Sequence, residues 1–418
     1  MTDRWDRDDL DARPLGPLIW TRRRALTAGV AAAGLAALRP VGALAAVGAR
    51  EAFPAESIDA LDRQITDLME AGRIPGLATA VIRGRELVWS KGHGFANLWR
   101  REPVRPDTLF MLASISKTFI STAVMQAVRD GLFGLDDDVS DILPFPVRTP
   151  EHPKRAITAR QLMTHTSSIR DRWSVWNDLY SDGDSPIGLG PFLQGYFVPG
   201  GEDYRRTNFY AAKPGSIYRY SNLGAALAAF LVEAASGAGF DVWCVNRIFE
   251  PLRMTRAGWH LADVPAEDVA MPYRWSSRDG RYEAHGQYGY PDYPDGALRT
   301  TAPQLARHLG MMMNGGTWRG ADLLERDTVR EILRSQIPDA AYGQGLIWYR
   351  SRTSRRLVIG HNGGDKGVAT VAFFDPAEDI GVVALANAGW RRAAGRWPLQ
   401  QIMNLLFDRA PSLETSSG

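Results

Sequence analysis

Four short apolar segments near the C-terminal end constrain the fold of this chain more than any other feature. They cover residues 346–350, 357–361, 368–375 and 380–386 of the 418-residue sequence, with short links between them. Such links join antiparallel neighbours, because parallel strands need a crossover of about a dozen residues or more. The sequence therefore predicts an antiparallel sheet in this part of the chain.

The N-terminal part predicts further elements of the same lobe. Residues 77–82 and 87–90 are apolar runs on either side of a polar turn, which is typical of a β-hairpin. Apolar residues at helical spacing predict a helix over residues 57–71 and another over residues 399–407. Strands and helices at both ends of the chain indicate that the two ends build one lobe together.

The middle of the chain has a different character. Residues 134–303 contain helical patches, such as 223–235, between long loops rich in Gly, Pro and aromatic residues. We expect a mostly helical lobe here, inserted between the halves of an α/β lobe that covers residues 50–133 and 304–410. The predicted fold class is α+β, with an antiparallel sheet flanked by helices from both chain ends.

Residues 1–45 have the pattern of an export signal. Arg22-Arg23-Arg24 precede an apolar run, residues 25–38, and the small residues Ala43-Leu44-Ala45 follow. The run is shorter than the roughly 20 residues that a membrane-spanning helix needs. This order predicts a signal peptide, of the twin-arginine type because of the paired arginines. We expect a periplasmic or extracellular protein, a single mature domain of residues 46–418 and no stable membrane anchoring after cleavage; an uncleaved anchor is the alternative.

Composition excludes several classes of function. The net charge of +2 and the lack of a basic stripe argue against a nucleic-acid partner. The seven histidines lack zinc-ligand spacing, so we expect no metal, and a single cysteine excludes an internal disulfide. We also expect no organic cofactor, because the chemistry of the motifs described next does not need one. Only five of 49 basic residues are Lys. A Lys in an apolar setting is therefore notable, since Lys loses its proton on desolvation more readily than Arg.

Ser114 and Lys117 form the first motif with chemical potential. They stand three residues apart at the start of a helix predicted over residues 114–129, within an apolar segment. Such residues share a helix face, with Cβ atoms roughly 5–6 Å apart. A serine hydroxyl becomes nucleophilic when a base takes its proton, and a desolvated lysine amine can be that base. A helix-capping serine with a solvated lysine remains the alternative.

Tyr220-Ser221-Asn222 forms the second motif, directly before an apolar helical run. A phenol can exchange protons with a hydroxyl, and an amide can hold a carbonyl. Tyr220 also fits a core aromatic, and Asn222 also fits a helix cap.

His361-Asn362-Gly363-Gly364 forms the third motif, after a predicted strand. Glycines at a strand let a ligand approach the backbone closely. A backbone N–H in this motif would complete an oxyanion hole with the N–H of Ser114. A surface turn with an incidental histidine is the alternative.

The order and spacing of the three motifs resemble the serine β-lactamase and penicillin-binding superfamily, with its S-x-x-K, Y-x-N and K-T-G motifs. The likeness is closest to the class C branch, which includes serine esterases, D-aminopeptidases and DD-carboxypeptidases. It implies a β-lactamase-like fold with an inserted helical lobe. The likeness covers nearly the whole mature chain and extends to flanking segments, which are residues 110–119, 157–169, 214–223 and 296–302.

The resemblance implies roles for the matched residues of the first two motifs. Ser114 would be the nucleophile that forms an acyl-enzyme. Lys117 and Tyr220 would share the general-base and general-acid work. Asn222 would orient the substrate.

The third motif departs from the family pattern. The resemblance places His361 where the family usually has Lys, with Gly363 in the same substrate-binding stretch and the Gly364 N–H in the oxyanion hole. Penicillin-recognising members usually carry Ser or Thr at the position of Gly364, and that hydroxyl helps to bind a substrate carboxylate. Its absence favours small esters or amides without an obligatory carboxylate.

Aromatic residues are frequent in two of the long loops. We expect either a broad aromatic-lined pocket for the acyl or leaving group, or loops that pack on themselves. We expect His165 to be structural. The loop aromatics are Trp173, Trp176, Tyr180, Phe192, Tyr196, Phe197, Tyr204, Tyr288, Tyr290 and Tyr293.

The predicted function is therefore a serine hydrolase of small esters or amides. Alternatives on the same site are a β-lactamase, DD-carboxypeptidase or D-aminopeptidase specificity, or acyl transfer to an alcohol or amine. A non-catalytic sensor that is acylated and then stops is the alternative of another class. Intact Ser114, Lys117 and Tyr220 argue against the sensor. The sequence does not define the oligomeric state.

Overall fold

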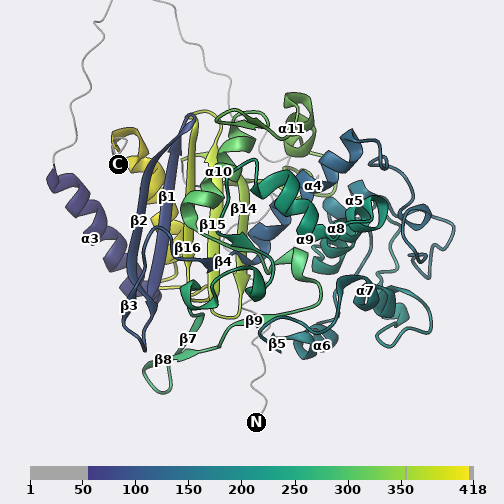
Figure 1. The fold of residues 1–418 in the computed structure, drawn as a ribbon, viewed down its shortest axis with the longest axis horizontal. Helices are drawn as coiled ribbons and strands as arrows, with labels where there is room; N and C mark the ends of the chain where they lie inside the picture. The colour runs from purple at the N-terminus through teal and green to yellow at the C-terminus, as the bar shows by residue number, and fades with distance from the viewer. Residues whose placement is uncertain (1–54, 354, 414–418) are drawn as a thin grey trace, which may run out of the picture.

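The computed structural model describes residues 55–353 and 355–413, so the expected signal peptide of residues 1–45 lies outside the described residues. Its centre is a seven-stranded sheet in the order β13-β14-β15-β16-β1-β2-β3, in which all neighbours are antiparallel (Figure 1). The strands are β1 (Gly76–Arg83), β2 (Glu86–Asn97), β3 (Glu102–Pro103), β13 (Tyr349–Arg352), β14 (Leu357–Asp365), β15 (Val368–Asp375) and β16 (Ile380–Ala386).

The two ends of the chain meet in the middle of this sheet. β1 pairs with β16 from Leu77 opposite Ala386 to Arg83 opposite Ile380. β1 and β2 form the expected hairpin, in which Arg83 lies opposite Glu86. The antiparallel sheet built from both chain ends is therefore confirmed.

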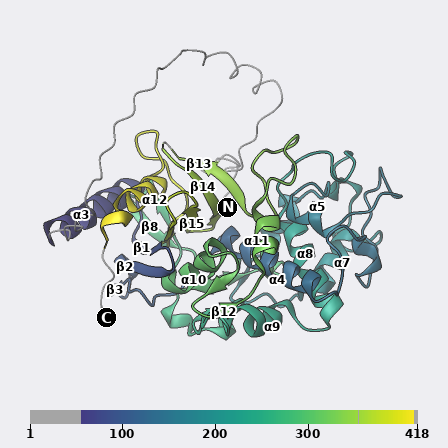
Figure 2. The same ribbon diagram turned by 90° about the horizontal axis from the view of Figure 1, so that it is seen from above.

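Helices cover both faces of the sheet. α3 (Ala55–Gly72) and α12 (Pro398–Arg409) pack together on one face, and α10 (Ala302–Met313) lies on the other (Figure 2). Successive side chains of a strand point to opposite faces. Accordingly, Phe373 of β15 joins the apolar cluster of α3 and α12, whereas Phe374 joins the larger cluster that includes α10.

A mostly helical region lies beside the sheet, with α8 (Asn222–Ser236) at its centre. α8 packs against α4 (Lys117–Arg129), α5 (Ala159–Met163) and α7 (Leu189–Phe197). Every residue from Asn222 to Val232 is buried. Within the described ranges, no single helix has the length and apolarity to cross a membrane, and α8 passes that test only together with the Phe240–Phe249 segment, bent by 85°.

Three local predictions differ from the structure. Ser114 lies in a 3₁₀ turn, Ala113–Ser116, and the α-helix begins only at Lys117. The strand expected over 346–350 is β13, which begins at Tyr349, because Ile347 has a φ of 69° that extended strands do not adopt. β14 runs on to Asp365, so the third motif lies inside a buried strand rather than after it.

Candidate active site

Ser114 lies in a turn that is fixed from two sides. The preceding residue, Ala113, has a φ of 49°, in the left-handed region that a non-glycine residue rarely adopts. The backbone N–H of Leu112 donates to Leu298 O at 2.8 Å, and Thr370 Oγ1 donates to Leu112 O at 2.7 Å. Contacts to Leu298 and to Thr370 of β15 therefore hold the turn in this conformation, with the buried Ser114 at its centre.

Lys117 is fully buried one turn later and points to Ser114. Its Nζ lies 3.2 Å from Ser114 Oγ and donates to the main-chain oxygen of Asp295 at 2.6 Å. The same Nζ lies 5.4 Å from the centroid of the Tyr220 ring and 3.9 Å from Asp295 Oδ2. The structure thus brings the predicted nucleophile and both predicted proton carriers into one cluster.

The half-buried carboxylate of Asp171 fixes the second motif. Asp171 Oδ1 accepts from Ser221 Oγ at 2.6 Å, and Asp171 Oδ2 accepts from the Asn222 N–H at 2.6 Å. Ser221 also caps α8, since its Oγ accepts from the Gly224 N–H, so the cap is Ser221 and not Asn222. Burial raises the pKa of the Asp171 carboxyl, and these hydrogen bonds oppose the rise.

His165 lies directly behind the second motif. Its Nδ1 accepts from the Ser221 N–H at 3.2 Å, and its ring centroid is 4.3 Å from that of Tyr220. The sequence predicted a structural role for His165. The structure adds that this histidine contacts a predicted site residue.

β14 closes the site on the other side. A Cβ atom on Gly363 would lie 3.0 Å from the Ser114 nitrogen, so only glycine lets the strand approach the turn this closely. Trp390 lies against the position where a Cβ atom on Gly364 would stand, and its indole N–H donates to Gly363 O at 2.7 Å. The centroid of the buried His361 ring lies 6.3 Å from the centroid of the Tyr220 ring. All three motifs therefore converge on Ser114.

The aromatic loops meet at the end of β14. Tyr180 donates to Asp365 Oδ1 at 2.8 Å and Tyr290 donates to Oδ2 at 3.3 Å, while the short strands Ser181–Asp182 and Tyr288–Gly289 pair. Burial raises the pKa of the Asp365 carboxyl, and these donors oppose the rise. The two loops are thereby joined next to Gly364.

The remaining loop aromatics lie elsewhere. Phe192, Tyr196 and Phe197 are buried within α7, and Trp173 is 39% exposed. The loops therefore pack partly on themselves. An aromatic-lined substrate pocket stays a prediction.

Sequence reasoning missed Asp171 and Asp295. Asp295 directly precedes Gly296, the first residue of a segment that was matched to the family. This position was the available signal in the sequence, and the structure shows that the segment is buried. Asp171 follows Ile169 by two residues in a polar stretch and carried no comparable signal. Among the described residues, no group of three or more His, Cys, Asp and Glu is arranged to hold a metal ion.

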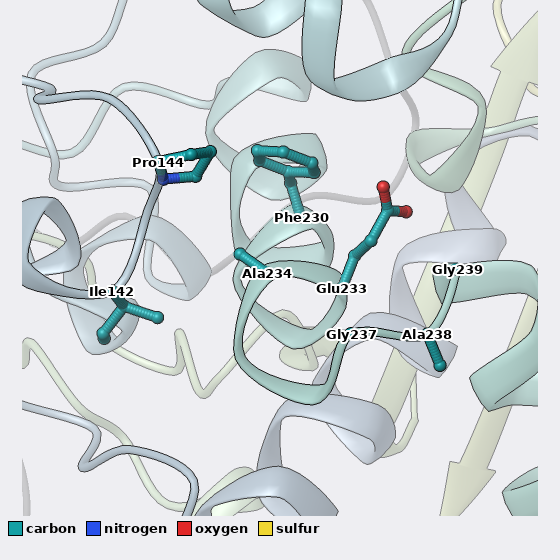
Figure 3. A pocket seen from close by; sticks show the side chains of 8 residues that line it. All are labelled: Ile142, Pro144, Phe230, Glu233, Ala234, Gly237, Ala238 and Gly239. Atoms are coloured by element: carbon teal, nitrogen blue, oxygen red, sulfur yellow. The ribbon is translucent and has the colours of Figure 1, made fainter.

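A separate hollow lies at the other end of α8. It has a volume of about 430 Å³, and its lining includes Phe230 and Glu233 of α8 (Figure 3). None of the predicted site residues lines it. With a rise of 1.5 Å per residue, Glu233 is roughly 16 Å along the helix from Asn222. This hollow is therefore not the site of the Ser114 cluster.

Comparisons with known proteins agree with the fold and with the family resemblance. The family model described as Beta-lactamase matches residues 61–401. Protein flp of Staphylococcus aureus (strain N315) is 22% identical over 341 residues, which cover 79% of this chain and 63% of that protein. The Beta-lactamase of Escherichia coli (strain K12) is 25% identical over 385 residues, which cover 85% of this chain and 95% of that protein.

A solved structure gives the same result for the fold. EstCE1, described as a hydrolase with promiscuous acyltransferase activity, superposes with a TM-score of 0.63 at 19% identity, over 84% of this chain and 100% of that chain. The described fold is thus β-lactamase-like. The chain belongs to the Beta-lactamase family, although it spans only about 63% of the length of the S. aureus relative.

Proposed function

We propose that the protein hydrolyses small esters or amides through an acyl-enzyme on Ser114. The observation that carries this proposal is the 3.2 Å distance between Lys117 Nζ and Ser114 Oγ within a buried site. A base at hydrogen-bonding distance is what a serine hydroxyl needs to become a nucleophile.

In the proposed reaction, Ser114 Oγ adds to the substrate carbonyl carbon while its proton passes to Lys117. The bond to the leaving alcohol or amine then breaks, and the leaving group takes a proton from Lys117, relayed by Tyr220. Water repeats the sequence on the acyl-enzyme, giving the acid and restoring the Ser114 hydroxyl. We assign the relay to Tyr220, whose ring centroid lies 5.4 Å from Lys117 Nζ.

The oxyanion would be held by the backbone N–H groups of Ser114 and Gly364. The close packing of Gly363 on the Ser114 nitrogen supports this assignment, because it brings the β14 backbone beside the turn. Asn222, at the start of α8, and His361, on β14, would orient the substrate.

An ester or amide without an obligatory carboxylate is the substrate class that Gly364 favours, because this position has no hydroxyl for a carboxylate. EstCE1 is described as a hydrolase with promiscuous acyltransferase activity, so transfer to an alcohol or amine is the second candidate. A β-lactamase, DD-carboxypeptidase or D-aminopeptidase specificity would use the same groups on another substrate.

The test is turnover of short- and medium-chain p-nitrophenyl esters and of a chromogenic cephalosporin, by the protein and by Ser114→Ala. We expect ester hydrolysis that the substitution abolishes and no cephalosporin turnover. Cephalosporin turnover would contradict the substrate class and assign a β-lactamase. Added alcohol or amine that diverts the acyl group from water would assign an acyltransferase.

We further propose export to the periplasm or beyond by the twin-arginine route. The support is the sequence order of Arg23-Arg24, the apolar run and Ala43-Leu44-Ala45. Replacing Arg23 and Arg24 by Lys should retain the protein in the cytoplasmic fraction. An unchanged distribution between fractions would refute this route.

A further inference from the structure

The Asp295 side chain is a buried acid that the proposed reaction does not yet use. Its carboxyl is 2% exposed, and its Oδ2 atom lies 3.9 Å from Lys117 Nζ. Within the described part of the chain, this Oδ2 atom accepts no hydrogen bond. The main-chain oxygen of Asp295, by contrast, already accepts from Lys117. The carboxyl is therefore not needed to hold the lysine in place.

The charges around Asp295 are mostly of its own sign. Lys117 faces it from α4, and Asp171, Asp292 and Asp365 act on it from a loop of the helical region, from the turn just before it and from the end of β14. Burial raises the pKa of the Asp295 carboxyl well above its ordinary value, and the three acids add to that rise while Lys117 opposes it. Asp295 is therefore a carboxyl that takes a proton readily.

The proposed reaction requires Lys117 to be a neutral amine before it accepts the proton of Ser114. An ammonium has no lone pair, so it cannot accept the proton of Ser114 until it has released one of its own. Lys117 is fully buried, so the neighbouring protein groups are the candidates for the acceptor. The side-chain acid that faces Lys117 is Asp295, whose Oδ2 atom lies 3.9 Å from Lys117 Nζ.

We propose that Asp295 accepts a proton from the Lys117 ammonium before acylation, leaving a neutral amine that takes the proton of Ser114. The inference rests on the function proposed above and adds a proton acceptor to it. Asp295 acts through Lys117 and does not touch the substrate.

The step balances in atoms and charge. An N–H bond of Lys117 breaks and an O–H bond of Asp295 forms, so a carboxylate–ammonium pair becomes a carboxylic acid and an amine with no change in net charge. When Ser114 attacks, its proton restores the ammonium. The pair then carries one positive charge beside the new oxyanion, which it stabilises. After release of the leaving group and hydrolysis, the acid returns its proton to the lysine.

The test is the rate at which a fluorophosphonate probe labels Ser114, measured against pH for the protein, Asp295→Asn and Asp292→Asn. Labelling needs only an activated serine, so it does not depend on the natural substrate. In Asp295→Asn the lysine must release its proton to solvent. We expect labelling near pH 6 to fall by about tenfold or more, with recovery at alkaline pH. The reason is that the acid limb, the part of the rate profile that rises with pH, shifts to higher pH.

Asp292→Asn is the matched control. It removes a neighbouring buried acid but keeps the proton acceptor. Its acid limb should stay in place or move to lower pH, since one repelling charge next to Asp295 is gone. A shift in the same direction in both variants would overturn the inference.

Other outcomes separate the inference from the proposed function. A uniform loss in Asp295→Asn with an unchanged acid limb would make Asp295 purely structural and overturn the inference alone. No labelling of the unsubstituted protein would overturn the proposed function and the inference with it. If Asp295→Asn does not fold, Asp295→Glu decides: it keeps a proton acceptor and should keep the acid limb, and an upward shift would refute the inference.

Discussion

The half-buried Asp171 and the fully buried Asp295 are two acids beside the same predicted site, and they differ in their hydrogen bonds. Asp171 accepts hydrogen bonds from the Ser221 hydroxyl and from the first N–H groups of α8. Asp295 Oδ2 accepts none in the described part of the chain and faces Lys117. Burial raises the pKa of both carboxyls. The difference suggests that Asp171 supports a helix end, whereas Asp295 is available to a proton.

The largest expected effect comes from removing the cation that both acids face. Lys117→Ala should lower ester hydrolysis by about 10³-fold or more, because the base next to Ser114 is lost. The measurement is kcat/KM for a p-nitrophenyl ester, with the melting temperature as a control for folding. Retention of more than about a tenth of the activity would exclude Lys117 as the base.

Replacing each of the two acids by asparagine distinguishes support of a helix end from availability to a proton. Asp171→Asn should lower the free energy of unfolding by about 2 kcal/mol, because an amide nitrogen would face donors that now have an acceptor. At about pH 4, where the folded-state carboxyl is protonated, Asp295→Asn should change it by less than about 1 kcal/mol, since no hydrogen bond to Oδ2 is lost. Chemical denaturation measures both values. Equal losses in the two variants would refute the distinction.

The pH dependence of stability provides a smaller but signed test. The folded-state pKa of Asp295 lies above its ordinary value of 3.8, so the unfolded chain ionises first as the pH rises. Stability should therefore fall with rising pH, from about pH 4 up to the folded-state pKa, and then level off. Asp295→Asn should flatten this decline. The measurement is denaturation at a series of pH values, and an identical slope in the variant would contradict the assignment.

A third acid, the half-buried Asp365, extends the comparison. It accepts from Tyr180 at 2.8 Å and from Tyr290 at 3.3 Å, so it resembles Asp171 rather than Asp295. Tyr180→Phe should reduce the free energy of unfolding by about 1 kcal/mol. If the joined aromatic loops also line the substrate site, the preference among ester chain lengths should change. An unchanged preference would leave these loops with a structural role alone.

Sequence patterns were most informative where local signals agree with the packing. β15 and β16 have the predicted bounds because every residue in them is buried, which leaves an uninterrupted apolar run. β13 was misplaced because the left-handed φ of Ile347 depends on a hydrogen bond to Met163, a residue far away in the sequence. Apolar periodicity does not contain that contact.

The candidate site also contains residues that the sequence indicated and residues that it did not. Ser114, Lys117, Tyr220 and His361 were found because their spacing resembles a known set of motifs. Asp171 and Asp295 were not, because a carboxyl becomes notable only when burial and its neighbours are known. Single acidic residues in a sequence are usually solvated, and tertiary packing decides the exceptions.

The acyl-enzyme on Ser114 is tested most directly by the mass of the protein after its reaction with a p-nitrophenyl ester has been rapidly quenched. We predict an added acyl group on the peptide that contains Ser114, formed within the first turnover and absent from Ser114→Ala. An acyl group on another residue, or ester turnover that Ser114→Ala leaves unchanged, would contradict it.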